Sequence, residues 1–504
     1  MLRKNKITIL ITVILIIGLG TLTISLTGCS GSSQQIRLGR KYLAANEYDE
    51  AIKAFRQAIE DDPQNIPARI GLAQAYSKTI KFYMISDLFE EAVDIAPNSA
   101  EVYIGFSQIH IEEGELNTAV DVLQQGYEKT KDKKIKKKLD EIIIGKPVTF
   151  EDKAFEAVIR QLIGRKTGDI MTSDLNRIDK LDIIGNQIVK SDVDSLFIIK
   201  EDKIYYTLKN KPIEEYGDIR TLKDLKHFKS LKRLRIRLQK DLDISALADF
   251  DNISCLRHLV ELRIQTSNIS NIDDLAAFTS IGCLDLAGNN IEDISTLNLE
   301  RSTYLDLSYN KISDISPLQN IRMLDYLFLS NNQISDISTL QDLTDLNMLS
   351  LSNNQISNIN PLQDLTDLQS LELSGNPIKD ISILGNLTEL EELRLSNIQI
   401  ADISPLKNLA VLKRLSLDDN QISDISILEN LVKLNSLELS NNQISDISPL
   451  QNLTGLKHLS LSNNQITDIS PLQDSTNLWT LIIDGNNITD HSPLDNLRFT
   501  KITK

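Results

Sequence analysis

Histidine, cysteine and aspartate are the residues of this chain that could perform catalysis or bind a metal ion. The 504 residues include five histidines and three cysteines. The histidines are widely separated, at His110, His227, His258, His458 and His491. The chain has no HExxH, GxSxG, GxxxxGK or CxxC motif. Because catalysis requires groups that converge on one point, the sequence predicts no catalytic residue, no cofactor and no enzyme activity.

Aspartate recurs at a fixed spacing in the second half of the chain, which raises the question of a calcium site. The row consists of Asp314, Asp336, Asp380, Asp402, Asp424, Asp446 and Asp468. Calcium requires six to eight oxygen ligands around one point, whereas these carboxylates are 22 residues or a multiple of 22 apart. Aspartate is also common at the start of helical turns, where it accepts a backbone hydrogen bond. We therefore expect these residues to cap turns, and we predict no metal site.

Cys29 is the residue for which the neighbouring sequence predicts a covalent modification. A basic N-terminus precedes an uncharged apolar run at residues 7–26, and LTGC follows with Cys29 as its last residue. This order is typical of an export signal. The stretch resembles the bacterial lipobox, which implies a signal peptide at residues 1–28 and a lipid on Cys29. An uncleaved transmembrane anchor is the alternative, because about 20 apolar residues can span a bilayer.

Both interpretations place the rest of the chain outside the cytoplasm. We expect residues 29–33 to form a tether and the protein to be lipid-anchored to the outer face of the membrane of a Gram-positive bacterium. Cys255 and Cys283 would be exported as well. They could form a disulfide only if their Cα atoms lay within about 7 Å, and we favour two separate thiols.

Charge is unevenly distributed along the chain. From residue 241 onward there are 15 Lys and Arg against 36 Asp and Glu, whereas the first 240 residues have 39 against 34. An acidic surface repels nucleic acid. The sequence therefore excludes a nucleic-acid partner for the C-terminal part.

A repeat of 34 residues occupies the region after the tether. Tyr42, Tyr76 and His110 coincide when the chain is shifted by 34 residues, and the apolar spacing within each unit predicts two helices. The first unit resembles the tetratricopeptide repeat (TPR) at Gly39, Tyr42, Tyr48, Ala51, Phe55, Ala58 and Pro63. The resemblance implies three TPR units and a capping helix over residues 34–141. We expect the lysine-rich end of this region to be solvated, with contact to anionic lipid as the alternative.

A second repeat, with a period of 22 residues, runs from about residue 229 to residue 504. Its consensus is LxLSxNxIxDISPLxxLxxL. The asparagine after each LxL falls at Asn289, Asn310, Asn332, Asn354, Asn376, Asn420, Asn442, Asn464 and Asn486. The LxL triplet predicts a short strand with its leucines in the core. A buried asparagine can donate and accept hydrogen bonds, so a stack of them can satisfy the backbone groups of successive turns.

This second repeat resembles the internalin-type leucine-rich repeat (LRR) of bacterial surface proteins. The resemblance implies a right-handed solenoid with a parallel sheet on the concave side and 3-10 turns on the convex side, and it implies that the concave sheet binds a protein. The predicted fold class is therefore a multidomain repeat protein, with a TPR superhelix, a helical cap and an LRR solenoid. Ser267, Gln239 and Ile398 replace the asparagine, and we expect a rearranged coil at Ile398, with Asn397 compensating.

Two further segments connect the repeats. Residues 148–188 resemble the helical cap that precedes surface LRR domains, with a first strand at its end. In residues 189–228 the period fails, and LFIIKEDKIYYTL predicts a β-hairpin within this irregular insert.

Residues that flank the leucines of each LxL face the concave solvent and are the candidates for partner binding. They include Tyr304, Asp306, Tyr326, Phe328, Met348, Glu372, Arg394, Arg414, Glu438, His458 and Ile482, with Trp479 at the edge. Exposed aromatic residues and arginines dominate interface energies. We therefore predict a binding patch at Tyr304, Tyr326 and Phe328, and a weaker one at Arg394 and Arg414.

The sequence as a whole predicts a monomeric, non-enzymatic, membrane-anchored lipoprotein that binds protein. One interpretation is a surface adhesion or recognition protein whose concave LRR face grips a protein of a host or neighbouring cell. The alternative is a scaffold or assembly factor for envelope complexes of its own cell. The identity of the partner is not contained in the repeats, because the surface residues determine it.

Overall fold

The structure is a computed structural model that describes residues 31–79, 82–113, 115–188, 195–200, 203–208, 211–212, 218–238, 241–244, 259–276, 278, 281–495, 497 and 501–503. These residues form two compact units, and the chain passes from one to the other between Gly145 and Lys146. The apolar run at residues 7–26, Cys29, Gln239 and Cys255 lie outside the described residues. Within the described part of the chain, no helix is long and apolar enough to cross a membrane.

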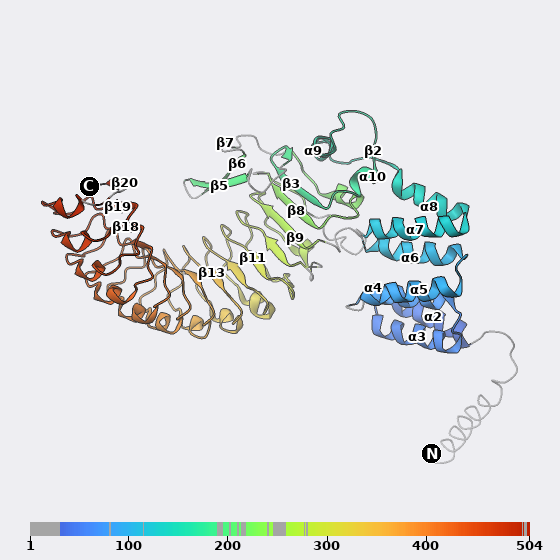
Figure 1. Ribbon diagram of the computed structural model, residues 1–504, viewed down its shortest axis with the longest axis horizontal. Helices are drawn as coiled ribbons and strands as arrows, with labels where there is room; N and C mark the ends of the chain where they lie inside the picture. The colour runs from blue at the N-terminus through green and yellow to red at the C-terminus, as the bar shows by residue number, and fades with distance from the viewer. Residues whose placement is uncertain are drawn as a thin grey trace, which may run out of the picture. The chain divides into compact units, whose positions relative to one another are not determined.

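The first unit is built from α-helices that pair as helical hairpins (Figure 1). Its helices are α2 (Gly31–Ala44), α3 (Tyr48–Asp61), α4 (Ile66–Ser77), α5 (Ile85–Ile95), α6 (Ala100–Glu112), α7 (Leu116–Thr130) and α8 (Lys133–Ile143), with the 3-10 turn η1 (Phe82–Met84) before α5. The Phe55 ring is fully buried, and a Cβ atom at Gly39 or Gly71 would lie within 2.7 or 2.3 Å of it. Glycine at both positions thus lets α2 and α4 approach α3. The helical hairpins predicted for this region are confirmed.

The start of α2 corrects the predicted tether. Residues 31–33, expected within it, form the first turn of this helix. Ser32 is fully buried and its hydroxyl accepts a hydrogen bond of 3.0 Å from Asn65. This contact with the chain before α4 holds the turn in the helix.

The second unit begins with a cap whose core is continuous with that of the repeats. The cap contains β1 (Pro147–Val148), α9 (Lys153–Ile163), β2 (Ile170–Met171) and α10 (Thr172–Leu175). Asp152 caps α9 by accepting hydrogen bonds from Ala154 and Phe155, and its other oxygen accepts one of 2.7 Å from the Arg220 backbone. One buried carboxylate thereby joins the cap to the first coil.

The sheet of the second unit has 15 strands along the curved solenoid (Figure 1), and they follow the sequence order except that β4 lies at the edge beside β3. They are β4 (Gln187–Ile188), β3 (Lys180–Ile184), β8 (Arg233–Arg237), β9 (Glu261–Gln265), β10 (Cys283–Asp285), β11 (Tyr304–Asp306), β12 (Tyr326–Phe328), β13 (Met348–Ser350), β14 (Ser370–Glu372), β15 (Glu392–Arg394), β16 (Arg414–Ser416), β17 (Ser436–Glu438), β18 (His458–Ser460), β19 (Thr480–Ile482) and β20 (Lys501–Thr503). Only β4 pairs antiparallel with its neighbour in this sheet. The fold class predicted from the 22-residue period is confirmed.

Two smaller features complete the unit. The strands β5 (Ser195–Lys200) and β6 (Lys203–Leu208) form the hairpin predicted in the insert, and β7 (Lys211–Pro212) pairs with β6. The 3-10 turns are η3 (Lys223–His227), η6 (Asp273–Leu275), η7 (Ser316–Asn320), η8 (Ser338–Asp342), η9 (Asn360–Leu362), η10 (Ser382–Asn386), η11 (Ser404–Asn408), η12 (Ser426–Asn430), η13 (Ser448–Leu450), η14 (Ser470–Leu472) and η15 (Ser492–Leu494).

Aspartates begin most of the convex turns. Asp336 accepts a hydrogen bond of 2.9 Å from the backbone of Ser338, and the same bond recurs at each aspartate of the row. The Ser338 bonds hold the pKa of Asp336 below its usual value. The carboxylates thus have the capping role predicted from their position in the repeat.

The asparagine ladder satisfies the backbone between coils. Asn354 donates from Nδ2 to the carbonyl oxygens of Leu329 in the preceding coil and Leu351 in its own coil, each at 3.0 Å, and its Oδ1 accepts a bond of 3.0 Å from Ile334. The other eight asparagines make the same set of bonds. Each of these side chains therefore ties two adjacent coils together.

The coil with Ile398 is rearranged, although not in the way predicted. Ile398 is buried, and Oδ1 of Asn420 in the next coil accepts from the backbone of both Ile398 and Ile400, each at 3.2 Å. Gln399 adopts a φ of 64°, whereas Gln421 at the same place in the next coil keeps a negative φ. The additional hydrogen bond of this coil is accepted by Asn420 and not by Asn397.

The coil with Ser267 reaches the same arrangement. Asn289 Oδ1 accepts from the backbone of Ser267 at 3.0 Å and of Ile269 at 3.1 Å, and Asn268 has a φ of 53°. The two coils that lack the asparagine therefore share one backbone arrangement. The next asparagine accepts a second N–H, and the following residue moves into the left-handed region.

Removing one ladder asparagine should destabilise the second unit strongly. Asn354→Ala leaves buried backbone groups of two coils without partners, and we expect a loss of about 2 kcal/mol in the free energy of unfolding. Equilibrium urea unfolding measures it. Gln355→Ala, at the exposed next position, is the control and should change stability by less than about 0.5 kcal/mol. Equal losses in the two variants would contradict the role of the ladder.

Candidate functional site

The predicted partner-binding residues lie along one face of the sheet, on β11 to β19, with Trp479 immediately before β19. Their side chains are exposed or partly exposed, whereas the leucines between them, such as Leu327 and Leu349, are fully buried. The alternation of the strands therefore places these residues on the concave face.

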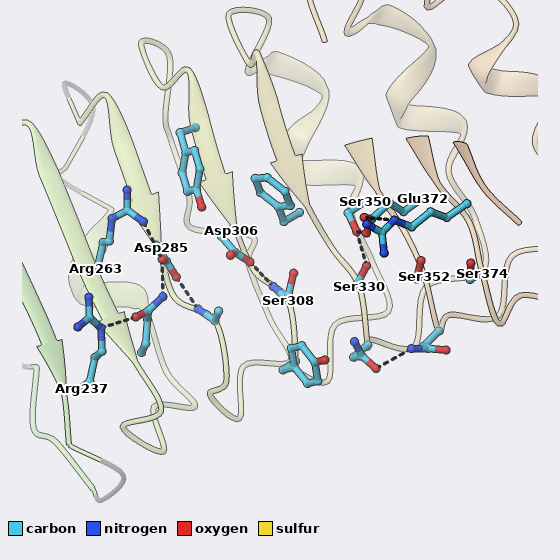
Figure 2. Close-up of a pocket in the computed structure, with 18 residues that line it drawn as sticks. Arg237, Arg263, Asp285, Asp306, Ser308, Ser330, Ser350, Ser352, Glu372 and Ser374 are labelled. Atoms are coloured by element: carbon cyan, nitrogen blue, oxygen red, sulfur yellow. Dashed lines mark hydrogen bonds and ion pairs between the residues drawn. The ribbon is translucent and has the colours of Figure 1, made fainter. Parts of the chain in front are cut away.

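A groove of about 550 Å³ occupies the first half of this face (Figure 2). Its lining combines predicted residues with unpredicted ones from β8, β9 and β10. The predicted ones are Tyr304, Asp306, Phe328, Glu372 and Arg394. Tyr326 and Met348 lie on strands of the groove without lining it. The remaining predicted residues lie beyond the groove, on β16 to β19 or, for Trp479, directly before β19: Arg414, Glu438, His458, Trp479 and Ile482.

The structure brings three aromatic residues together, and we call Tyr304, Tyr326 and Phe328 the aromatic cluster. The Tyr304 ring centroid lies 5.4 Å from that of Phe328 and 6.2 Å from that of Tyr326. These distances fall in the range of favourable aromatic pairs. The cluster is a rigid apolar surface at the side of the groove, as the adjacent repeats predicted.

The groove also has lining residues that were not predicted from the sequence, and four of them are charged or polar side chains of the first strands: Arg237, Arg263, Gln265 and Asp285. They occupy the same alternating positions in RLRIR of β8, ELRIQ of β9 and CLD of β10. Reading the pattern upstream of Tyr304 would have found them. Irregular repeat lengths hid the register in this region.

Asp285 is a buried carboxylate with internal partners. It is 1% exposed, and it accepts hydrogen bonds from Gln265 at 2.5 Å, from Arg263 at 3.3 Å and from the Ala287 backbone at 3.1 Å. Burial raises its pKa, and the three donors oppose that shift. The guanidinium of Arg263 also lies over the Tyr304 ring, 5.0 Å from the centroid.

Asp306 lies directly opposite Asp285 in the register of β10 and β11. Its carboxylate accepts a bond of 2.9 Å from the Ser308 backbone (Figure 2). Among the described residues, no Lys, Arg or His lies within ion-pair distance of it. Burial, and then the charge of Asp285, raise the pKa of Asp306 to about 7. The groove thus contains a carboxyl group that titrates near neutral pH.

The second predicted patch is occupied by internal ion pairs. Glu392 is buried and accepts bonds from Arg394 at 2.7 Å and from the Arg414 Nε at 2.7 Å. Arg394 also contacts Glu372 at 3.2 Å. Burial raises the pKa of Glu392, but the bonds from Arg414 and Arg394 outweigh it and hold the pKa below its usual value. These arginines therefore already have carboxylate partners. Asp306, by contrast, has no cationic partner among the described residues.

A smaller aromatic site lies near the C-terminal end of the sheet. Trp479 is 52% exposed, and the His458 ring meets it edge-on at 5.9 Å. The Lys457 ammonium lies over the Trp479 ring at 4.9 Å. This pair is separated from the groove by several strands.

The parallel sheet, the convex turns and the asparagine ladder define a leucine-rich-repeat solenoid, which follows tetratricopeptide helices in the chain. Sequence families described as "Leucine Rich repeats (2 copies)" match residues 322–364, 366–408 and 411–452, and "Leucine rich repeat" matches residues 434–488. "Tetratricopeptide repeat" matches residues 42–79. No curated protein matches the chain.

Solved structures place the chain in a family. An internalin (inlF) from Listeria monocytogenes is 32% identical, with 71% of this chain and 96% of that chain covered and a TM-score of 0.57. An internalin C2 (inlC2) from the same species is 42% identical over 34% of this chain and 76% of that chain, with a TM-score of 0.34. A leucine-rich-repeat protein from Leptospira interrogans is 21% identical over 56% and 81%, with a TM-score of 0.47. The chain belongs to the internalin family of leucine-rich-repeat proteins.

Both repeat families are protein-interaction modules, and no catalytic family matches the chain. The groove agrees with this class, because it offers aromatic and charged side chains on a rigid sheet. Solenoids use such extended concave surfaces for binding.

Asp306 should make stability depend on pH near neutrality. An unfolded aspartate ionises near pH 4, whereas folded Asp306 keeps its proton up to about pH 7. The stability contributed by this proton is present below pH 4 and is lost as the pH rises through 7. The Asp306→Asn variant has no carboxyl group to ionise here and should not lose this stability. The difference in free energy of unfolding between the variant and the wild type should therefore increase by about 2 kcal/mol in favour of the variant between pH 5 and pH 8. Urea unfolding at both pH values measures the difference.

The matched control for this prediction is Asp336→Asn, because Asp336 is an exposed convex cap whose pKa is lowered. Asn358 shows that asparagine caps the same position in another coil. The control should show no gain between pH 5 and pH 8. A constant difference between Asp306→Asn and the wild type across this range would contradict the assignment.

Proposed function

We propose that this protein is an exported lipoprotein that recognises a protein partner through the groove and aromatic cluster on its concave LRR face. The observation that carries the proposal is the aromatic cluster itself. Three large side chains from adjacent strands line or border a concave surface, with Tyr326 37% exposed. Aromatic residues at the centre of an interface contribute most to binding energy.

The anchor in this proposal is Cys29. The apolar run and LTGC support attachment of a lipid at this residue, on the outer face of the cell membrane. Membership of the internalin family supports a role at the cell surface. The TPR unit offers a second protein-binding surface closer to the anchor in the sequence. We infer a surface recognition protein that acts as a monomer.

Loss of the cluster should abolish partner capture. For this test, the chain without residues 1–28 carries a photo-crosslinker and is exposed to surface proteins of intact bacteria and of candidate host cells. Captured proteins are quantified by mass spectrometry. Tyr326→Ala combined with Phe328→Ala should reduce capture of the partner at least about tenfold, since each hot-spot residue contributes about 2 kcal/mol.

The control for capture is His458→Ala combined with Trp479→Ala, which removes two rings from the same face outside the groove. It should retain capture. If every protein captured by the wild type is captured equally by the groove variant, the groove is not the binding surface. The cell of origin of the captured protein distinguishes adhesion from envelope assembly.

Lipidation should depend on Cys29 alone. Cells that express the full chain and grow with a radioactive fatty acid should label the wild type and Cys283→Ala, whereas Cys29→Ala should lose the label. Cell fractionation should then find the Cys29 variant outside the lipid-anchored membrane fraction. Equal labelling of the wild type and Cys29→Ala would exclude the lipid anchor.

A further inference from the structure

The groove contains a complete arginine-binding arrangement made by its own residues. Arg263 on β9 contacts the Asp285 carboxylate on β10 at 3.3 Å and lies over the Tyr304 ring on β11. A carboxylate on one side and an aromatic face on the other is the environment that suits a planar guanidinium. Three consecutive strands thus supply a cation, a carboxylate and a ring.

The same arrangement is repeated one strand further along, without its cation. In the register of the sheet, Asp285 pairs with Asp306 and Tyr304 pairs with Tyr326. A second carboxylate and a second tyrosine therefore stand beside the first pair. The position that corresponds to Arg263 is occupied by Asp285 itself, so this second site has an additional negative charge in place of a positive one.

Asp306 forms no ion pair with any Lys, Arg or His in the described part of the chain. The charged and titratable groups around it are Asp285 on β10, Arg263 on β9 and Tyr304 on its own strand, whereas its register partner on β12 is the apolar Phe328. Arg263 is already paired with Glu261 at 2.6 Å and with Asp285. Toward the other end of the groove, Arg394 is paired with Glu392 and Glu372.

We propose that the groove receives an arginine side chain of the protein partner, whose guanidinium pairs with Asp306 and stacks on the aromatic cluster at Tyr326 and Phe328. This inference rests on the proposed function and names the chemistry of the ligand. The partner's guanidinium would repeat the contact that Arg263 makes with Asp285 and Tyr304. Residues 241–504 carry a net charge of −21, from 15 Lys and Arg against 36 Asp and Glu, which favours approach of a basic segment.

The unpaired state of the Asp306 carboxylate supports the same conclusion. An unpaired carboxylate beside Asp285 lowers the stability of the free protein at neutral pH. A natural chain keeps a destabilising polar group most often at a functional site. The partner's cation would remove this penalty on binding, so binding should strengthen as Asp306 ionises.

Saturation-transfer NMR with short peptides tests the inference directly. The probes are acetyl-Leu-Arg-Leu-amide and its neutral counterpart acetyl-Leu-Gln-Leu-amide, titrated onto the chain without residues 1–28. At pH 8 the arginine peptide should bind at least about tenfold more tightly than the glutamine peptide. Its affinity should fall about tenfold at pH 5.5, because Asp306 is then protonated.

Three variants separate the site from general attraction to an acidic surface. Asp306→Asn should weaken the arginine peptide about tenfold at pH 8 and remove the pH dependence, while Asp336→Asn, with the same change of charge on the convex side, should leave both unchanged. Tyr326→Ala retains the carboxylate and should also weaken binding. It covers the case in which Asp306→Asn fails to fold. Equal binding of the two peptides, or equal loss in Asp306→Asn and Asp336→Asn, would overturn the proposal.

The experiments distinguish failure of the arginine inference from failure of the proposed function. If the arginine peptide does not bind while the Tyr326 and Phe328 double variant still loses its protein partner, the ligand chemistry is wrong and the groove remains the interface. If the double variant keeps its partner, the groove itself is excluded. An acetyl-Leu-Lys-Leu-amide peptide that binds as tightly as the arginine peptide would overturn the stacking part of the inference, since an ammonium does not stack as a planar group.

Discussion

The hydrogen bonds of the buried asparagines are the constraint on which the solenoid depends. A parallel strand of three residues followed by a tight turn leaves backbone groups that its own coil cannot satisfy. Each asparagine donates to carbonyl oxygens of two coils and accepts an N–H from one of them. The coils are therefore joined at a fixed spacing, which places the ring centroid of Tyr304 5.4 Å from that of Phe328 and 6.2 Å from that of Tyr326 on the next strand. The groove is lined by side chains of successive strands that are held at this spacing.

Two coils of the solenoid form without the ladder asparagine. At Ile398 and Ser267 the next asparagine accepts a second N–H, and one residue moves to a positive φ. The additional bond is accompanied by a conformation that is unfavourable for a residue other than glycine. Because the strands on both sides keep their register, the concave face continues across the substitution. The solenoid can therefore vary the ladder without losing the binding surface.

Charged residues are paired to different extents in the two halves of the concave face. From β14 to β16, glutamates and arginines neutralise one another across neighbouring strands. At β10 and β11, two aspartates stand opposite each other and only Asp285 has an arginine. The exposed apolar rings lie beside this unbalanced pair. This contrast between a paired half and an unpaired carboxylate beside the aromatic cluster is the basis on which we propose a basic, partly apolar ligand.

The sequence by itself determined the repeat architecture, the buried leucines, the ladder and the proximity of Tyr304, Tyr326 and Phe328. A period of 22 residues assigns every position to the core or the surface, and equal repeats place equal positions side by side. Only the tertiary structure decided that Arg394 and Arg414 are paired with Glu392, that Asp285 opposes Asp306, and that Asn420 accepts the backbone N–H of Ile398. Those contacts depend on side-chain conformations across coils and on the register of irregular repeats, and a period in the sequence specifies neither.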